Sequence, residues 1–376
     1  MTKKINKEVE TKNNRRTFIT KGALGAVAAG VAVTGITPAS ASKKRVLKMV
    51  MTWPKKFPGL GVGAERLADR ITFATNGRIT IKVYGAGELV PAFESFDAVS
   101  NGTADVYHGA AYYWQGKTKA ASFFAAVPFG MTATEFHAWL RWGGGQELWD
   151  KLYGRFNLKP FQAGNTGVQM GGWFRKEIKS INDLRGLKMR MPGLGGSVLN
   201  KVGGSAVSLP GGEIFQALQT GTIDATEWVG PYNDLPMGFY KVAPYYYYPG
   251  FHEPGTALEI VFNKDVWKSF SKQDQEIITA IIEAENATML AEFNAKNSSA
   301  LDILVNKHGV KLRQFSDEIY KELYKATQEV LQDFVESDKD AAKVYKSYSA
   351  FAESQRRWNR LADGGYTKLR DVVKEK

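Results

Sequence analysis

Residues 164–191 read GNTGVQMGGWFRKEIKSINDLRGLKMRM, and this stretch decides the fold class. It opens with an apolar segment, interrupted by glycines, that is typical of a strand. Ser180 and Asp183 then form a Ser-x-x-Asp pair, the pattern of a capping box around a short helical turn. From 187 to 191, apolar residues alternate with basic ones, which is the period of a strand with one apolar face. The stretch therefore predicts a strand, a capped turn and a second strand.

Arg190 lies on the second predicted strand, on the face opposite Met189 and Met191. A planar guanidinium that is always charged, held on a rigid strand, suits bidentate recognition of a carboxylate. We hypothesise that Arg190 anchors an anion in a ligand cleft. The alternative is a solvated arginine at a strand edge, and periodicity alone leaves both interpretations open.

The rest of the chain alternates strands with helices. Predicted strands cover about residues 45–52, 79–83, 104–109 and 258–263. Predicted helices cover about residues 64–74, 89–99, 134–153 and 212–219. Such alternation predicts a mainly parallel α/β sheet. A length of 376 residues is enough for two domains.

Two C-terminal regions are predicted to be helical. Residues 271–306 contain no proline or glycine, and about 35 residues of continuous helix would span roughly 50 Å. That length exceeds one domain, so we expect this helix to brace two domains. The tail beyond residue 338 is charged and carries aromatic residues such as Trp358. It either packs on its own domain or forms a dimerisation arm.

Composition excludes several kinds of site and partner. The chain has no cysteine, which excludes disulfides, thiolate nucleophiles and cysteine-ligated zinc. Its net charge is +12, and residues 1–41 carry seven Lys or Arg and two Glu, so the remainder is mildly basic at +7. No nucleic-acid motif accompanies this charge, so we do not expect DNA or RNA as a partner.

The N-terminus reads as an export signal. Residues 14–21 are NRRTFITK, a twin-arginine pattern, and a small-residue apolar segment follows at 22–36. Ala-Ser-Ala at 39–41 is a cleavage site of the A-x-A kind. A transmembrane anchor is the alternative, but the apolar segment is short of the ~20 residues that a spanning helix needs. We expect a twin-arginine signal at residues 1–41 and a periplasmic protein.

The chain shows no G-x-S-x-G, H-E-x-x-H or P-loop motif, and its four histidines lack metal-ligand spacing. Glu227 and Glu253 are candidates for an acid/base pair or for oxygen ligands of Na⁺, Ca²⁺ or Mg²⁺. A buried carboxylate would repel an anionic ligand, and a bridging cation would resolve that conflict. Tyr112 and Tyr113 follow a predicted strand end, where α/β sheets bind ligands; packing in the core is the alternative.

Four motifs resemble the periplasmic substrate-binding subunits of tripartite ATP-independent periplasmic (TRAP) transporters. They are GNTGVQMGGWFR at 164–175, S-x-x-D-L-x-G-L-K-M-R at 180–190, GTIDATEWVGP at 221–231 and YYYYPG at 245–250. The resemblance covers essentially the whole chain after the signal. Its most specific part is Thr226-Glu227-Trp228 with Glu253 downstream. The subgroup that it resembles binds 2-oxo and 2-hydroxy monocarboxylates such as pyruvate or lactate.

The resemblance implies an α/β, two-domain periplasmic binding protein fold with a hinged interdomain cleft and a long domain-spanning helix. The expected divisions are domain 1 at 42–164 plus about 250–270, domain 2 at about 165–249 plus the C-terminal helices, a bracing helix at about 271–306 and a helical arm at about 339–376. The arm would support a homodimer.

The resemblance also implies a site. Arg190 resembles the arginine that pairs with the substrate carboxylate. The expected substrate-binding residues are Gln169, Arg190, Trp228, Glu253, Tyr112 and Tyr113. The expected ligands of a cation, Na⁺ or Ca²⁺, that also binds the substrate are Gln169, Glu227, Glu253 and Trp228 through its backbone carbonyl. No catalytic residue is expected.

We therefore predict an extracytoplasmic solute receptor that binds a small 2-oxo or 2-hydroxy acid with a cation and delivers it to a membrane permease. The alternatives are a periplasmic enzyme that uses Glu227 or Glu253 as a base, and the ligand-sensing module of a signalling system. The sequence leaves open the exact substrate and its chain length, Na⁺ against Ca²⁺, and the oligomeric state. It also leaves open the role of His252, which stands where we expect an aromatic residue in relatives.

Overall fold

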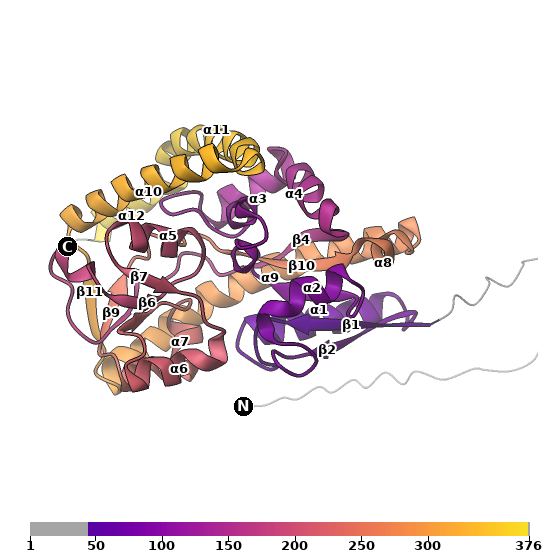
Figure 1. The fold of residues 1–376 in the computed structure, drawn as a ribbon, viewed down its shortest axis with the longest axis horizontal. Coiled ribbons are helices and arrows are strands. Elements are labelled where there is room, and N and C mark those ends of the chain that lie inside the picture. The colour runs from indigo at the N-terminus through magenta and orange to yellow at the C-terminus, as the bar shows by residue number, and fades with distance from the viewer. Residues whose placement is uncertain (1–43, 375–376) are drawn as a thin grey trace, which may run out of the picture. The chain divides into compact units, whose positions relative to one another are not determined.

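The computed structural model describes residues 44–374, which form two β-sheets covered by helices (Figure 1). The predicted export signal at residues 1–41 lies outside the described residues. Among residues 44–374, none of the helices combines the length and the apolar character that crossing a membrane requires.

The first sheet has the strand order β2-β1-β3-β10-β4. Its strands are β1 (Arg45–Met51), β2 (Ile79–Tyr84), β3 (Val106–Gly109), β4 (Leu158–Asn165) and β10 (Ala257–Asn263). β1 pairs in parallel with β2 and β3, whereas β10 is antiparallel to both β3 and β4. The sheet is therefore mixed: β1, β2, β3 and β4 run in one direction and β10 runs against them, so the prediction of a mainly parallel sheet is right for every strand but β10.

The second sheet has the order β11-β9-β5-β8-β6-β7 and is also mixed. Its strands are β5 (Gly172–Phe174), β6 (Lys188–Arg190), β7 (Ser205–Val207), β8 (Ala225–Thr226), β9 (Tyr245–Tyr248) and β11 (Lys311–Gln314). β6 lies between β7 and β8 and is parallel to both. β5 runs antiparallel to β8 and β9 because it enters the sheet directly from β4 without a crossover helix.

Two segments connect the sheets, at residues 166–171 and 249–256, and they run side by side. The chain leaves the first sheet at the end of β4 and re-enters it at the start of β10, which is why β10 is antiparallel. The Thr166 amide donates to the Thr256 carbonyl (3.1 Å), and the Gln169 amide donates to the Glu253 carbonyl (3.1 Å). This pairing brings Gln169 and Glu253 together, although they are far apart in sequence.

Twelve α-helices cover the sheets in the described part of the chain. They are α1 (Leu60–Ala74), α2 (Ser95–Ser100), α3 (Ala133–Trp142), α4 (Gly145–Tyr153), α5 (Gly193–Lys201), α6 (Gly211–Thr220), α7 (Pro231–Met237), α8 (Lys264–Lys268), α9 (Lys272–Asp302), α10 (Asp317–Ser337), α11 (Lys339–Leu361) and α12 (Asp363–Lys374). The single helix predicted at 134–153 is wrong. Three glycines at 143–145 interrupt it, and Gly144 has a φ of 81°, in the left-handed region that ends a helix.

α9 lies against elements of both sheets (Figure 1). The Ser271 hydroxyl caps it by accepting from the Asp274 amide (3.0 Å). α9 contacts α1 and β4 on the side of the first sheet and α7 on the side of the second. Phe293 of α9 is fully buried and packs on the Tyr232 ring, with 5.8 Å between centroids. Its ring also lies against Gly59, so close that a side chain there would place its Cβ 2.7 Å from the ring. The helix therefore joins the α1 and α7 ends of the fold. The division into two domains stays a prediction.

The last three helices pack on different parts of the fold. α10 contacts α5, whereas α11 contacts α3 and α4 beside the first sheet (Figure 1). α12 packs along α11 and buries none of its residues.

Candidate functional site

The site forms where β6 and β8 end side by side. Arg190 is the last residue of β6 and pairs with Thr226 of β8 in parallel register. The Glu227 amide, one residue further along, donates to the Arg190 carbonyl (3.2 Å). Parallel strands carry their ligand sites at their carboxyl ends. The predicted capping box before β6 is confirmed, since the Ser180 amide donates to Asp183 Oδ2 (2.8 Å).

Arg190 is buried, with 1% of its surface exposed, so it is not a solvated edge residue. Its Nη1 donates to Glu227 Oε1, and Nε donates to the Leu209 carbonyl (3.2 Å). The guanidinium carbon lies 5.1 Å from the Trp228 ring centroid, a cation–π contact. Burial alone would lower the pKa of Arg190, but the charge of Glu227 and the nearby tyrosines outweigh it and raise that pKa. The guanidinium is therefore a fixed positive charge inside the protein.

Glu253 places a second buried carboxylate beside Glu227. Thr256, three residues along, donates its hydroxyl to Glu253 Oε2. Burial, and then the charge of Glu227, raise the pKa of Glu253 to about 7. Two carboxylates share this space with a single arginine, so the site without a cation favours a proton on Glu253.

Gln169 presents an oxygen atom to the same site. Its side-chain nitrogen donates to the hydroxyls of Thr166 and Thr256, both at 3.2 Å. This orients the amide so that Oε1 has no hydrogen-bond partner among residues 44–374 although it is buried. Glu227 Oε2 is likewise buried and without a hydrogen-bond partner in that range. Buried polar atoms are seldom left unpaired, so these oxygens mark a place for a ligand.

The donor set fits a hard cation. Glu227, His252 and Glu253 each offer an atom within 4.8 Å of the others, and the orphaned oxygen of Gln169 adds a neutral ligand. Carboxylate and amide oxygens are the ligands that Ca²⁺ prefers. A cation held by Gln169, Glu227 and Glu253 would neutralise the two buried carboxylates.

Aromatic residues close the remaining sides. Tyr112 and Tyr113 lie on a short 3₁₀ helix, Ala111–Trp114, directly after β3. Burial raises the pKa of both hydroxyls, so each stays a neutral donor. Tyr113 Oη is 3.4 Å from Arg190 Nη2. Tyr112 packs against Gly193, which has a φ of +63°. A side chain at position 193 would place its Cβ only 2.8 Å from the Tyr112 Cβ. The structure thus brings both tyrosines to the site.

Trp228 forms a wall between the site and the loop before α1. Its ring packs edge-on against Phe57, with 6.1 Å between centroids. The ring also lies against Gly211, where an added Cβ would come within 2.6 Å of it. Its indole Nε1 is buried without a hydrogen-bond partner among the described residues. All residues that the sequence predicted for the site, Gln169, Arg190, Trp228, Glu253, Tyr112, Tyr113 and Glu227, lie in this one cluster. Their individual roles stay predictions.

Sequence reasoning missed Asp234, which positions the turn after Trp228. The Asp234 carboxylate accepts from the Val229 and Gly230 amides (3.1 and 3.2 Å) and from the hydroxyl of Tyr246 (2.7 Å). Burial raises the pKa of Asp234 to about 7. The only signal in the sequence was an acidic residue soon after Gly-Pro at the start of α7, and that pattern is common in ordinary helix caps.

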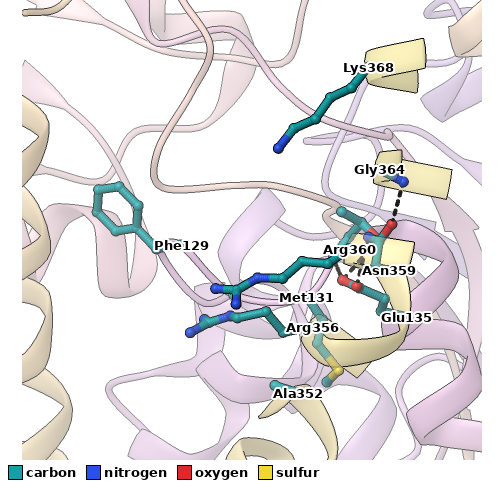
Figure 2. A pocket seen from close by; sticks show the side chains of 11 residues that line it. Phe129, Met131, Glu135, Ala352, Arg356, Asn359, Arg360, Gly364 and Lys368 are labelled. Atoms are coloured by element: carbon teal, nitrogen blue, oxygen red, sulfur yellow. Dashed lines mark hydrogen bonds between the residues drawn. The ribbon is translucent and has the colours of Figure 1, made fainter. Parts of the chain in front are cut away.

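A separate pocket of about 310 Å³ lies between the loop before α3 and helices α11 and α12 (Figure 2). Asn359 links its two sides, donating to Glu135 (3.0 Å) and accepting from the Gly364 amide (2.9 Å). Arg356, Arg360 and Lys368 make it basic. None of the residues predicted for the site lines this pocket.

Residues 49–338 match the family described as "Bacterial extracellular solute-binding protein, family 7". The chain belongs to this family. A monocarboxylate 2-oxoacid-binding periplasmic protein of Nostoc sp. is 45% identical over 320 residues, which are 85% of this chain and 87% of that relative.

Two solved structures are similar over nearly their whole length. A TRAP periplasmic solute binding protein from Pseudoalteromonas atlantica, with bound sodium and pyruvate, has a TM-score of 0.84 and 40% identity, covering 87% of this chain and 99% of that chain. One from Colwellia psychrerythraea, with bound calcium and pyruvate, has a TM-score of 0.84 and 40% identity, covering 87% and 100%. The predicted TRAP solute-binding family and the predicted α/β periplasmic binding protein fold class are confirmed. These relatives are receptors, not enzymes.

Proposed function

We propose that this chain is the solute receptor of a TRAP transporter and binds a small 2-oxo or 2-hydroxy monocarboxylate, pyruvate or lactate, together with Na⁺ or Ca²⁺. The observation that carries the proposal is one buried arginine beside two buried carboxylates and an orphaned amide oxygen. A lone anion would be repelled by Glu227 and Glu253. A cation bound with the anion leaves every charge in the cluster with an opposite neighbour.

Each group has a role in this proposal. Arg190 holds the ligand carboxylate as a fixed, planar donor. Gln169, Glu227, the Trp228 carbonyl and Glu253 hold the cation, whose contribution is to neutralise charge and to bind ligand oxygens. Tyr112, Tyr113 and Trp228 exclude water and limit the size of the ligand, which strengthens the electrostatic interactions inside.

The same geometry requires the site to open. Arg190, Glu227 and Glu253 are each at most 3% exposed, so a ligand cannot enter the described conformation. Two short connecting segments, 166–171 and 249–256, join the two sheets, and helix α9 and the α10–α11 pair pack across both sides. We infer that the ligand enters when the sheets move apart about these segments, and that closure delivers a loaded receptor to the permease.

Isothermal titration calorimetry tests the ligand and the cation together. We expect pyruvate and lactate to bind in the presence of Na⁺ or Ca²⁺ and to lose most of their affinity after chelation and desalting. Propionate, which lacks the 2-position oxygen, is the matched control ligand and is expected to bind at least tenfold more weakly. Equal affinity for propionate and pyruvate, or pyruvate binding unaffected by removal of cations, would refute the proposal.

A homodimer through the C-terminal helices is the second part of the proposal. The α11–α12 region exposes large apolar side chains that an isolated chain would leave in water: Trp358, Leu361, Tyr366, Leu369, Val372 and Val373. We expect light scattering after size exclusion to give a dimer for the wild type and a monomer for Leu369→Asp with Val373→Asp. Phe73→Asp, at an exposed apolar residue on α1, is the control that keeps the dimer.

The export route and the permease are proposed on the sequence and the family. Arg15→Lys with Arg16→Lys is expected to leave the protein in the cytoplasm, since the twin-arginine pair is the recognised feature of that signal. Uptake of labelled pyruvate by cells that carry the TRAP permease should require the receptor. Normal export of the double variant would reject the twin-arginine route.

A further inference from the structure

His252 is buried at the centre of the candidate site, with 1% of its surface exposed. The ring packs edge-on against Phe251 (5.5 Å between centroids, 68° between planes). Gly195 lies against the other side of the residue, where an added Cβ would come within 2.8 Å of the His252 Cβ. Backbone and neighbours therefore hold this imidazole in one place. Neither ring nitrogen makes a hydrogen bond to any residue of the range 44–374.

Comparison with the other histidines separates His252 from an ordinary core residue. His108 also has two unpaired buried nitrogens, but it lies inside the first sheet against Trp53 (5.1 Å), and burial lowers its pKa to about 3. His137 is bonded to Gln162 (2.9 Å), and His308 stacks on a tyrosine near the surface. Of these four histidines, only His252 lies within ion-pair distance of a carboxylate: its Nε2 is 3.5 Å from Glu227 Oε2.

Glu227 shows what fits beside this imidazole. One oxygen of its carboxylate is held by Arg190 Nη1, and the other is the atom 3.5 Å from His252 Nε2. The Glu227 carboxylate itself lies between the arginine and the histidine, and its Oε2 approaches Nε2 without forming a hydrogen bond. Every protonation state of an imidazole has at least one N–H donor. A buried donor without a partner costs free energy, and a ligand oxygen would remove that cost.

Oxygen ligands make a cation role for His252 unnecessary. Na⁺ and Ca²⁺ prefer oxygen, and imidazole is a ligand of zinc, copper and nickel rather than of hard cations. Gln169 Oε1 and Glu227 Oε2 are already available as unpaired oxygens. The imidazole is thus left to face the anion.

We propose that His252 is a ligand-binding residue that donates a ring N–H to an oxygen of the bound 2-oxo monocarboxylate, as a second donor beside Arg190. The inference rests on the proposed function, because it takes pyruvate-like anions as the ligand. It assigns His252 to recognition of the anion rather than to the cation or to core packing.

Calorimetry with pyruvate and calcium tests this assignment with two variants. His252→Phe keeps the ring shape without a donor and is expected to weaken binding roughly ten- to a hundredfold, the effect of one hydrogen bond to a charged group. His252→Gln keeps a donor near the position of Nε2 and is expected to recover most of that loss. Binding by His252→Phe within threefold of the wild type, or His252→Gln as weak as His252→Phe, would overturn the inference.

Long-range ¹H–¹⁵N spectra of the wild type give a readout that does not depend on a variant folding. We expect calcium alone to shift the His252 ring signals partly, through Glu227 and Glu253, and pyruvate to cause a further shift when it joins the calcium-loaded protein. The rings of His108, His137 and His308 are internal controls. A full shift with calcium alone would make His252 a cation ligand and reject the proposal. If the wild type binds no 2-oxo acid, the proposed function fails first and this inference with it.

Discussion

Lowering the pH from 8 to 6 is expected to weaken calcium binding about tenfold, because a proton competes with the cation for Glu253. Burial and the charge of Glu227 raise the pKa of this carboxyl to about 7. It is therefore about nine-tenths ionised at pH 8 and about one-tenth ionised at pH 6, a ratio near ten, or ~1.4 kcal/mol of binding free energy. Calcium binds the ionised form, so affinity rises with pH and levels off above about pH 8.

Protonation of His252 also weakens calcium binding as the pH falls. Burial lowers the pKa of His252, but its interaction with Glu227 and the charge of Glu253 outweigh burial and raise it. An imidazolium formed at low pH repels a cation. The tenfold change is therefore a lower bound for the wild type.

Calorimetric titration of the metal-free protein with calcium, at pH 6, 7 and 8 in two buffers of different ionisation enthalpy, measures both affinity and protons. We expect release of about one proton per calcium at pH 6 and close to none at pH 8. Glu253→Gln should bind calcium more weakly at every pH, with a flatter profile. Equal affinity of the wild type at pH 6 and 8, or the same pH dependence of affinity in Glu253→Gln as in the wild type, would contradict the reasoning.

Three further predictions use residues that the structure separates clearly. Arg190→Met should weaken pyruvate binding more than a hundredfold by calorimetry, and Arg190→Lys should recover only part because it lacks the planar fork; near-equal affinity of Arg190→Lys and wild type would argue against bidentate recognition. Burial raises the pKa of Glu259 to about 7, although Tyr107 and Trp114 donate hydrogen bonds to its carboxylate. Between about pH 4.5 and 7 the unfolded chain therefore loses this proton while the folded protein keeps it, and the free energy of unfolding falls as pH rises. Melting temperatures of Glu259→Gln should fall less than those of the wild type between pH 5 and 8, and parallel curves would exclude Glu259 as the cause. Phe293→Ala should lower the free energy of unfolding by about 3–5 kcal/mol in urea, whereas Trp142→Ala, at a 90% exposed residue, should change it by less than ~0.5 kcal/mol; similar losses in both would mean that burial is not the cause.

The strand and helix patterns predicted from sequence were right where periodicity was long and wrong where glycine interrupted it. The alternation at 79–83 gave β2, and the stretch of 271–306 without proline or glycine contains α9. The helix predicted at 134–153 failed at Gly144, because a left-handed residue ends a helix whatever its neighbours favour. Sheet direction could not be predicted from alternation, since β10 is antiparallel only because the chain has visited the second sheet first.

For the site, the sequence by itself determined the residue types, and the motifs around 164–191 and 221–231 identified the family. Arg190 is the clearest case: its strand, its charge and its membership of a conspicuous motif were all readable, but its burial was not. Only the tertiary structure decided that Arg190 pairs with Glu227, through the parallel register of β6 and β8. It also decided that two chain crossings place Gln169 beside Glu253. Such contacts join residues far apart in sequence, and local patterns carry no information about which strand ends will meet.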